Sequence, residues 1–323
     1  MLNNMKVLLV LLVVIAGLAF WVLQDNQVPD QNKPLIPEWQ GDGDAMGKVN
    51  RVVISQAGEQ ITLHQAGNRW VLNDGFYASI DPLFSLLQSF KQAEIVEAKT
   101  ANPENHAQIE LSNDDLKVEF FSDLGSNAYH VGKKTASGLT FVRLAGEDQT
   151  YTVKALDAIV FNQDNWQLKT VLDISGDQIQ AIQINTAEGS LIDASRNPDD
   201  GNLVLDNVPE GFQVKADASI NQLSNGLSRL MIDDAVPLDV MEEELKVNAR
   251  YLLVNDQEIF IKVYAKEDAH FMVIESDQFP EYSAWMMKIA DYKFKAFNRN
   301  VSEFVEPVDA STSDDESEAG SIE

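Results

Sequence analysis

Short runs in which apolar and polar residues alternate dominate the chain after its first fifty positions. Residues 49–55, 60–65 and 69–73 are three such runs, separated by the turn residues Ala57-Gly58 and Ala66-Gly67-Asn68. Alternation with a period of two places one face of each strand on a core, so we predict an antiparallel meander. Further strands are predicted at residues 108–111, 116–122, 128–132, 139–144 and 150–154.

A helical pattern interrupts this series of strands. Leu83, Leu86, Leu87 and Phe90 recur at i, i+3, i+4 and i+7, which forms one apolar stripe on a helix that begins near Asp81-Pro82. We expect this stripe to pack on the sheet. A second short helix is predicted at residues 156–161.

The same order of elements recurs later in the chain. Ala78-Ser79-Ile80 opens the first helix, and Ala218-Ser219-Ile220 opens a second one, which Gly226 weakens at its middle. We therefore predict an α+β fold with two tandem repeated units of antiparallel β-meander plus packed helix, at residues 48–172 and 173–298. Three further pairs echo one another in the same order: Val52-Val53-Ile54 with Ile182-Gln183-Ile184, Tyr129-His130-Val131 with Phe260-Ile261-Lys262, and Trp166-Gln167-Leu168-Lys169 with Tyr292-Lys293-Phe294-Lys295.

One uncharged apolar run, from Val7 to Leu23, is much longer than any other. As a helix it spans roughly 25 Å, near the short end of what crosses a hydrocarbon core of ~30 Å. Lys6 precedes the run and Asp25 follows it. The positive-inside rule then predicts a single-pass N-terminal transmembrane anchor, residues 1–23, in a bacterial inner membrane, with the bulk of the chain periplasmic. A cleaved signal peptide is the alternative, although its apolar region is usually shorter, ~7–15 residues.

Both ends of the remaining chain have biased compositions. Prolines and glycines among polar residues predict a linker at residues 24–47. Residues 302–323 contain eight acidic residues and neither Lys nor Arg, so a disordered acidic tail is predicted at residues 299–323.

The charge balance argues against one class of partner, nucleic acids. The chain has 51 acidic against 24 basic residues, and its net charge is −27. Binding to phosphate backbones needs clustered Lys and Arg, so we expect no nucleic-acid partner. The chain has no cysteine, which removes disulfides and cysteine-based metal sites.

The sequence offers no catalytic, cofactor-binding or metal-binding motif, so we predict a non-enzymatic protein. None of the four histidines lies at i+3 or i+4 from another, and Gly226-Leu227-Ser228 lacks the context of a nucleophile elbow. Acidic pairs such as Asp199-Asp200 fit turns, and the larger aromatic residues fit core positions. Lys133-Lys134 fits a solvated hairpin tip, with an anion site as the alternative. The four histidines are His64, His106, His130 and His270.

Several segments in order resemble a known family. They read VNRVVIS from Val49, IDPLFSLLQSF from Ile80, YHVGKK from Tyr129 and WQLKTVLDI from Trp166. This order is similar to that of the membrane-anchored family named domain of unknown function 4340, best over residues 48–184 and more loosely to residue 298. The chain departs from commoner members at Asn105-His106-Ala107, where a Tyr-Gly-Leu segment is usual.

The resemblance implies a function, since such proteins are similar to auxiliary partners of ABC transporters of the gliding-motility type. It implies a periplasmic accessory subunit and brings no catalytic residues. We therefore expect a membrane-tethered interaction protein of an ABC-type complex. A module that binds an envelope polymer or small solute between the two units is one alternative, and an unrecognised hydrolase is another.

Overall fold

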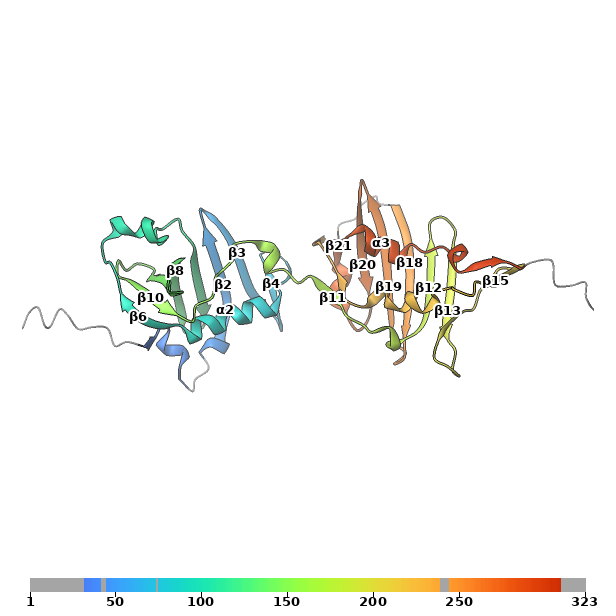
Figure 1. Ribbon diagram of the computed structural model, residues 1–323, viewed down its shortest axis with the longest axis horizontal. Helices are drawn as coiled ribbons and strands as arrows, with labels where there is room; N and C mark the ends of the chain where they lie inside the picture. Colours follow the sequence, from blue (N-terminus) through green and yellow to red (C-terminus); the bar gives the residue numbers. More distant parts are fainter. Residues whose placement is uncertain (1–31, 42–44, 74, 239–243, 309–323) are drawn as a thin grey trace, which may run out of the picture. The chain divides into compact units, whose positions relative to one another are not determined.

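The computed structural model describes residues 32–41, 45–73, 75–238 and 244–308, which fold as two units that divide between Gln167 and Leu168 (Figure 1). The fold is α+β and mainly β. Within the described residues, no helix has the length and apolar character needed to cross a membrane. The predicted anchor at residues 7–23 lies outside these residues and stays a prediction.

The first unit is built on one antiparallel sheet. Neighbouring strands run in the order β1 (Lys33–Pro34), β6 (Glu94–Ala98), β10 (Thr150–Lys154), β9 (Thr140–Leu144), β8 (Gly125–Lys134), β7 (Lys117–Ser122), β2 (Val49–Gln56), β3 (Glu59–Ala66), β4 (Arg69–Leu72) and β5 (Phe76–Tyr77). The predicted meander is therefore present, because β2, β3 and β4 pair in sequence order.

Helix α2 (Ile80–Gln92) lies along one face of this sheet (Figure 1). Its stripe of Leu83, Leu86, Leu87 and Phe90 is buried, as the spacing predicts. The ring of Phe90 lies 4.8 Å from that of Phe120 on β7, in an edge-on contact. Burial of four large apolar side chains, at about 1.5–3 kcal/mol each, fixes this helix on the sheet.

The segment before the meander belongs to the core. β1 pairs with β6, and a 3-10 turn, η1 (Pro37–Trp39), follows it. Ile36 and Trp39 are buried, and the Trp39 ring contacts Phe120 at 5.1 Å. The proline and glycine pattern predicted a linker throughout residues 24–47, but its few large apolar residues pack as part of the first unit.

Two predicted elements of the first unit are wrong. Residues 108–111 were predicted as a strand, but a 3-10 helix, η3 (Pro103–Ile109), includes the first two of them and the other two have no strand structure. The Asn102 side chain caps this helix, and Pro103 favours its first turn. Residues 156–161 were predicted as a helix and have no regular secondary structure. Two short 3-10 turns, η2 (Met46–Lys48) and η4 (Gln163–Asn165), complete this unit.

The second unit contains its own antiparallel sheet. The order is β14 (Leu203–Leu205), β13 (Leu191–Arg196), β12 (Ile179–Thr186), β18 (Glu244–Leu253), β19 (Glu258–Lys266), β20 (Ala269–Glu275), β21 (Trp285–Ile289) and β17 (Asp234–Pro237). Two short ribbons accompany it: β11 (Thr170–Leu172) with β16 (Leu230–Met231), and β15 (Phe212–Val214) with β22 (Val305–Pro307). Its helical segments are η5 (Gly176–Gln178), η6 (Ile220–Leu227), η7 (Pro280–Ala284), α3 (Asp291–Phe297) and η8 (Val301–Glu303).

The start of the predicted acidic tail is folded. β22 pairs with β15, and the side chains of Phe304 and Val305 are buried in the second unit. Residues 309–323 lie outside the described part of the chain. The tail prediction thus placed the boundary too early, because three apolar residues between 301 and 305 are enough to continue the fold.

The two sheets share one strand order. The first sheet contains the order β4-β3-β2-β7-β8-β9-β10-β6, from the meander to the strand that follows helix α2. The second sheet has the order β14-β13-β12-β18-β19-β20-β21-β17, and each of its strands corresponds to the strand at the same place in the first order. In the chain, helix α2 lies between β4 and β6, and the 3-10 helix η6 lies between β14 and β17. The matched triplets Val52-Val53-Ile54 and Ile182-Gln183-Ile184 both lie on the central opening strand. A repeated unit nevertheless stays a prediction, because strand order alone does not establish it.

Candidate functional site

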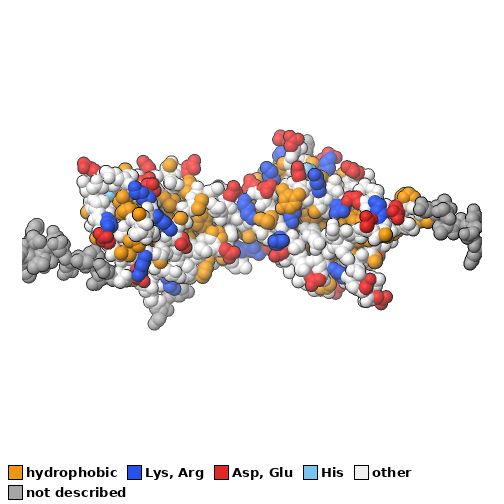
Figure 2. Space-filling view, in the orientation of Figure 1, with side chains coloured by type: hydrophobic (Ala, Val, Ile, Leu, Met, Phe, Trp, Pro, Cys, Tyr) orange, Lys and Arg blue, Asp and Glu red, His pale blue; other side chains and the backbone are white. Residues whose placement is uncertain are grey.

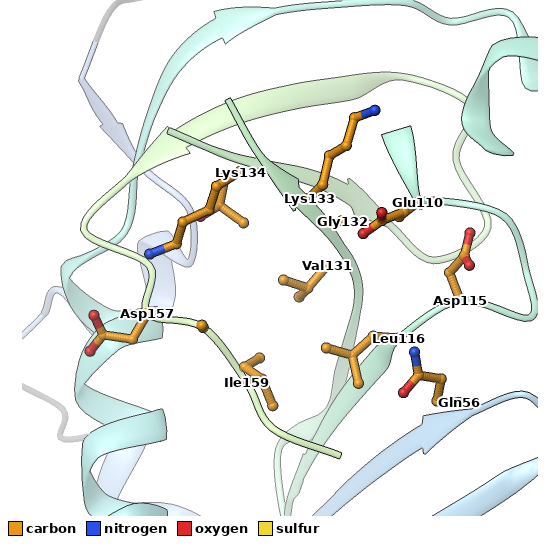
Figure 3. A pocket seen from close by; sticks show the side chains of 12 residues that line it. Gln56, Glu110, Asp115, Leu116, Val131, Gly132, Lys133, Lys134, Asp157 and Ile159 are labelled. Carbon is orange, nitrogen blue, oxygen red and sulfur yellow. The ribbon is translucent and has the colours of Figure 1, made fainter. Parts of the chain in front are cut away.

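A hollow of about 310 Å³ opens at one end of the sheet in the first unit (Figure 3). Leu116, Val131 and Ile159 form an apolar floor. Charged and polar side chains surround this floor, which is typical of a site that orients a small ligand. The polar rim comprises Gln56, Glu110, Asp115, Lys133, Lys134, Thr140 and Asp157.

The two lysines singled out in the sequence lie on this rim. They end strand β8, before the turn to β9, so the hairpin is present. A register shift between Val131 and Lys134 gives the two side chains different directions. Lys133 points away from the hollow in Figure 3 and donates a 2.5 Å hydrogen bond to the Gln108 carbonyl oxygen. The Lys134 side chain makes no hydrogen bond or ion pair with the described residues, and is therefore available to a ligand.

One wall of the hollow is residues 99–116, which we name the wall segment. The Arg143 guanidinium, only 5% exposed, fixes this segment to the sheet. Its Nε and Nη2 donate to the Leu111 carbonyl oxygen at 3.2 and 3.0 Å, and Nη2 also donates to Asn113 Oδ1 at 3.1 Å. Hydrogen bonds from a charged donor are about twice as strong as neutral ones, so Arg143 is the main anchor of the wall.

Further hydrogen bonds support the wall segment. Thr150 Oγ1 donates to the Thr100 carbonyl oxygen at 2.8 Å. His106 Nε2 lies 2.9 Å from the Asp148 carbonyl oxygen, and His106 is buried. Asp115 Oδ2 accepts hydrogen bonds from the amide and hydroxyl of Ser112, which fixes the last turn of the wall segment. These contacts hold the wall carboxylates in place before any ligand arrives.

Close packing at Gly132 positions Glu110. A methyl group added at Gly132 would lie 2.1 Å from the Ile109 carbonyl oxygen and 3.1 Å from that of Glu110. Glu110 itself has a φ of 60°, a left-handed conformation that costs most residues about 1 kcal/mol or more. The absence of a side chain at Gly132 thus allows the wall to approach β8 and turn Glu110 toward the hollow.

His130 is buried beneath the wall. Its side chain is 4% exposed, and its Nδ1 has no hydrogen-bond partner among the described residues. The sequence predicted an exposed or hydrogen-bonded strand histidine here, and this prediction is wrong because the wall segment covers β8. Burial, followed by the charges of Arg143 and Lys117, lowers the pKa of His130 to about 4, against smaller opposing effects of Asp115 and Glu119.

This burial predicts an acid sensitivity of the first unit. The pKa of His130 is about 4 in the folded protein and about 6.5 in an unfolded chain. The unfolded state therefore binds more protons between these values, and the free energy of unfolding decreases as pH falls from about 6.5 to 4. In urea titrations at pH 7 and pH 4.5, His130→Leu should show a smaller loss of unfolding free energy than the wild type, by roughly 2 kcal/mol.

A histidine on the same sheet provides the control. His64 on β3 is half-buried and lies outside the wall contacts, so His64→Leu should retain the pH dependence of the wild type. Equal pH dependence in His130→Leu and the wild type would show that His130 does not titrate below its ordinary range.

The wall opposite residues 99–116 is a segment without regular structure, residues 155–162, which we name the strap. Thr140 Oγ1 donates to the Leu156 carbonyl oxygen, and Trp166 Nε1 donates to that of Val160, both at 3.2 Å. Between these two points Asp157 is exposed on the rim, with no side-chain partner among the described residues. The strap therefore contributes one free carboxylate and the apolar side chain of Ile159.

The remaining candidates from the sequence lie apart from one another. His270 stacks on Phe294 with a centroid distance of 3.8 Å, and its Nδ1 lies 3.2 Å from Asp291 Oδ1. Within the described ranges, no three His, Asp or Glu side chains form a group that could hold a metal ion. Asp199 and Asp200 lie in a turn, as predicted, where Asp200 Oδ1 accepts a hydrogen bond from the Asn202 amide at 2.9 Å.

The aromatic residues follow the predicted core role unevenly. Trp166 is buried at 4% exposure, whereas Tyr292 is 64% exposed on α3. Tyr292 is the second residue of α3, and the buried residue of this helix is Phe297. Ser228 follows the 3-10 helix η6 and contributes its backbone to the helix end, and no hydrogen bond joins it to a histidine within the described residues.

Sequence reasoning missed most of the rim. Glu110, Asp157 and Gln56 come from three segments far apart in the chain. Lys133-Lys134 gave a local signal, as adjacent cations in an acidic chain, and Asp115 belongs to an acidic pair that was interpreted as surface charge. Nothing in the residues around Glu110 indicates its left-handed backbone or its approach to β8.

The fold and this hollow define a two-unit, mainly β protein with a small polar-rimmed pocket. A sequence profile described as domain of unknown function (DUF4340) matches residues 53–248, which is more than half of the chain, so the chain belongs to this family. The matched region includes residues of both units. No curated protein and no solved structure matches the chain.

Proposed function

We propose that the protein is a non-catalytic, membrane-tethered accessory component of an ABC-type transport complex, with its two units on the periplasmic side. The observation that carries this proposal is the architecture: one apolar run of anchor length, residues 7–23, precedes two units with the same strand order. We also propose that these units are repeats, since two of the matched sequence pairs lie on corresponding strands, β2 with β12 and β8 with β19. The transporter association comes from the family resemblance and is an analogy.

The surfaces of the units suit protein contacts. On the face seen in Figure 2, acidic and basic side chains are interspersed over each unit without forming one large patch of either sign. Ile80 and Phe84 are adjacent on α2 at i and i+4 and are 52% and 55% exposed. An exposed pair of large apolar side chains on a helix is a common anchor in protein interfaces.

The test is photo-crosslinking in native membranes. A photoreactive phenylalanine analogue at Phe84, with the chain at native expression, should crosslink to a permease subunit of an ABC complex. The same analogue at Phe141, a half-buried position on β9, is the control for nonspecific capture. Recovery of the chain alone from Phe84 and from a second exposed position, Tyr292, would contradict the proposal.

A further inference from the structure

We propose that the hollow in the first unit binds a short peptide stretch that carries a cationic amino group beside an apolar side chain. This inference does not depend on the accessory role, since it follows from the lining of the hollow. A free peptide and an exposed segment of a protein share this chemistry, and the experiment below distinguishes them.

The cationic group is assigned to the side of the wall segment. Glu110 has no side-chain partner among the described residues, and Asp115 uses only Oδ2 in its contacts with Ser112. Gln56 lies at the same side of the hollow in Figure 3 and adds an amide oxygen. Two carboxylates and an amide oxygen in a partly desolvated hollow favour an ammonium or guanidinium ligand.

The apolar floor selects the neighbouring group. Leu116 ends the wall segment, Val131 lies on β8 and Ile159 belongs to the strap, and their side chains surround the middle of the hollow (Figure 3). An aliphatic side chain placed on this floor gains about 25 cal/mol for each Å² removed from water. A cation without an apolar group does not gain this free energy of burial.

The opposite side favours a peptide group over a carboxylate. Lys134 and Asp157 lie there together, and no ion pair joins them among the described residues. An amide satisfies both, because its carbonyl oxygen accepts from Lys134 and its N–H donates to Asp157. A carboxylate would gain from Lys134 but would be repelled by Asp157, which argues against the simple anion site suggested by the lysines alone.

The hollow is formed before binding. Arg143, Thr150 and His106 hold the wall, and Thr140 and Trp166 hold the strap. Binding then costs little conformational entropy in the protein, which favours a measurable affinity for a small ligand. A hollow of about 310 Å³ is at the lower end for ligand pockets, so we expect a dissociation constant on the order of 0.1–1 mM.

Binding can be followed by NMR through the methyl groups of the apolar floor. The full chain in detergent, methyl-labelled at Ile, Leu and Val, is titrated with acetyl-Leu-Lys-Ala-amide, and NMR shifts of Leu116, Val131 and Ile159 are followed. These methyl groups should shift in a saturable manner, while Ile261 in the core of the second unit should not. The matched peptide acetyl-Leu-Glu-Ala-amide should cause no saturable shift.

Two matched variants locate the charge. Glu110→Gln should weaken binding of the lysine peptide by about three- to tenfold, since it removes one charge from the proposed amine contact. Glu104→Gln lies on the same wall segment but outside the hollow, and should bind as the wild type does. Equal weakening by the two variants, or equal binding of the lysine and glutamate peptides, would overturn the proposal.

A second peptide distinguishes the sources of the ligand. Leu-Ala-amide presents its α-amino group, as a free peptide does, whereas the capped lysine peptide represents a protein segment. Tighter binding of Leu-Ala-amide supports a free-peptide ligand, and tighter binding of the capped peptide supports a partner segment. Absence of saturable shifts with both peptides up to about 10 mM, ten times the weakest affinity expected, would overturn the proposal.

Discussion

Replacing Gly132 by alanine should destabilise the first unit by about 3 kcal/mol, the largest single-site effect that we expect in this pocket. The added methyl group would lie 2.1 Å from the Ile109 carbonyl oxygen, which no real contact allows. The atom it meets is backbone, so relief requires movement of the whole wall segment. Insertion into a packed interior usually costs 1–3 kcal/mol, and backbone displacement places this case at the upper end. Urea unfolding at pH 7 measures the change.

A second glycine provides the control for Gly132. Gly41 has no atom within 4 Å of an added methyl group and no positive φ, so Gly41→Ala should change stability by less than about 0.5 kcal/mol. Displacement of the wall should also remove peptide binding in Gly132→Ala while the protein is still folded. Unchanged stability in Gly132→Ala would mean that the wall segment does not pack on β8 as described.

The sequence predicts the sheets well because their signal is local. Alternation in Val49–Gln56 and Glu59–Ala66 reports directly which side chains face the core, and the turn residues between them fix the antiparallel pairing. The stripe on α2 is equally local. Failures occur where tertiary packing decides, as at Ile36 and Trp39, which were assigned to a linker although the core needs them.

The pocket could not be predicted for a related reason. Lys134 was visible as a cation next to another cation, but its counterparts Glu110 and Asp157 are defined only by the approach of the wall and the strap to β8. Part of each segment was predicted with the wrong secondary structure, residues 108–111 as a strand and residues 156–161 as a helix. Their actual conformations depend on distant anchors, Arg143 for the wall and Trp166 for the strap.

Gly226 gives the second large prediction, in the second unit. The sequence marked it as a weak point of a helix, but the structure gives it a packing role. A methyl group at this position would lie 2.5 Å from Oη of Tyr251 and 3.3 Å from its Cζ. Tyr251 is completely buried on β18. Gly226→Ala should therefore cost about 2–3 kcal/mol, although alanine alone favours a helix by up to about 1 kcal/mol.

Removal of the Tyr251 hydroxyl should relieve this clash. Its oxygen is buried and has no hydrogen-bond partner among the described residues, so Tyr251→Phe should be neutral or slightly stabilising. Removal of the hydroxyl also removes the closest contact of the added methyl group. In the Tyr251→Phe background, Gly226→Ala should then cost less than about 1 kcal/mol, which is a coupling free energy of about 1–2 kcal/mol between the two sites.

Urea unfolding of the four proteins in this cycle measures the coupling. Tyr264→Phe on the neighbouring strand β19 serves as the control, since it removes a tyrosine hydroxyl from the same sheet without touching Gly226. Gly226→Ala should cost the same in that background as in the wild type. A cost that is also unchanged by Tyr251→Phe would assign the effect to the backbone of η6 and not to the packing of its glycine against β18.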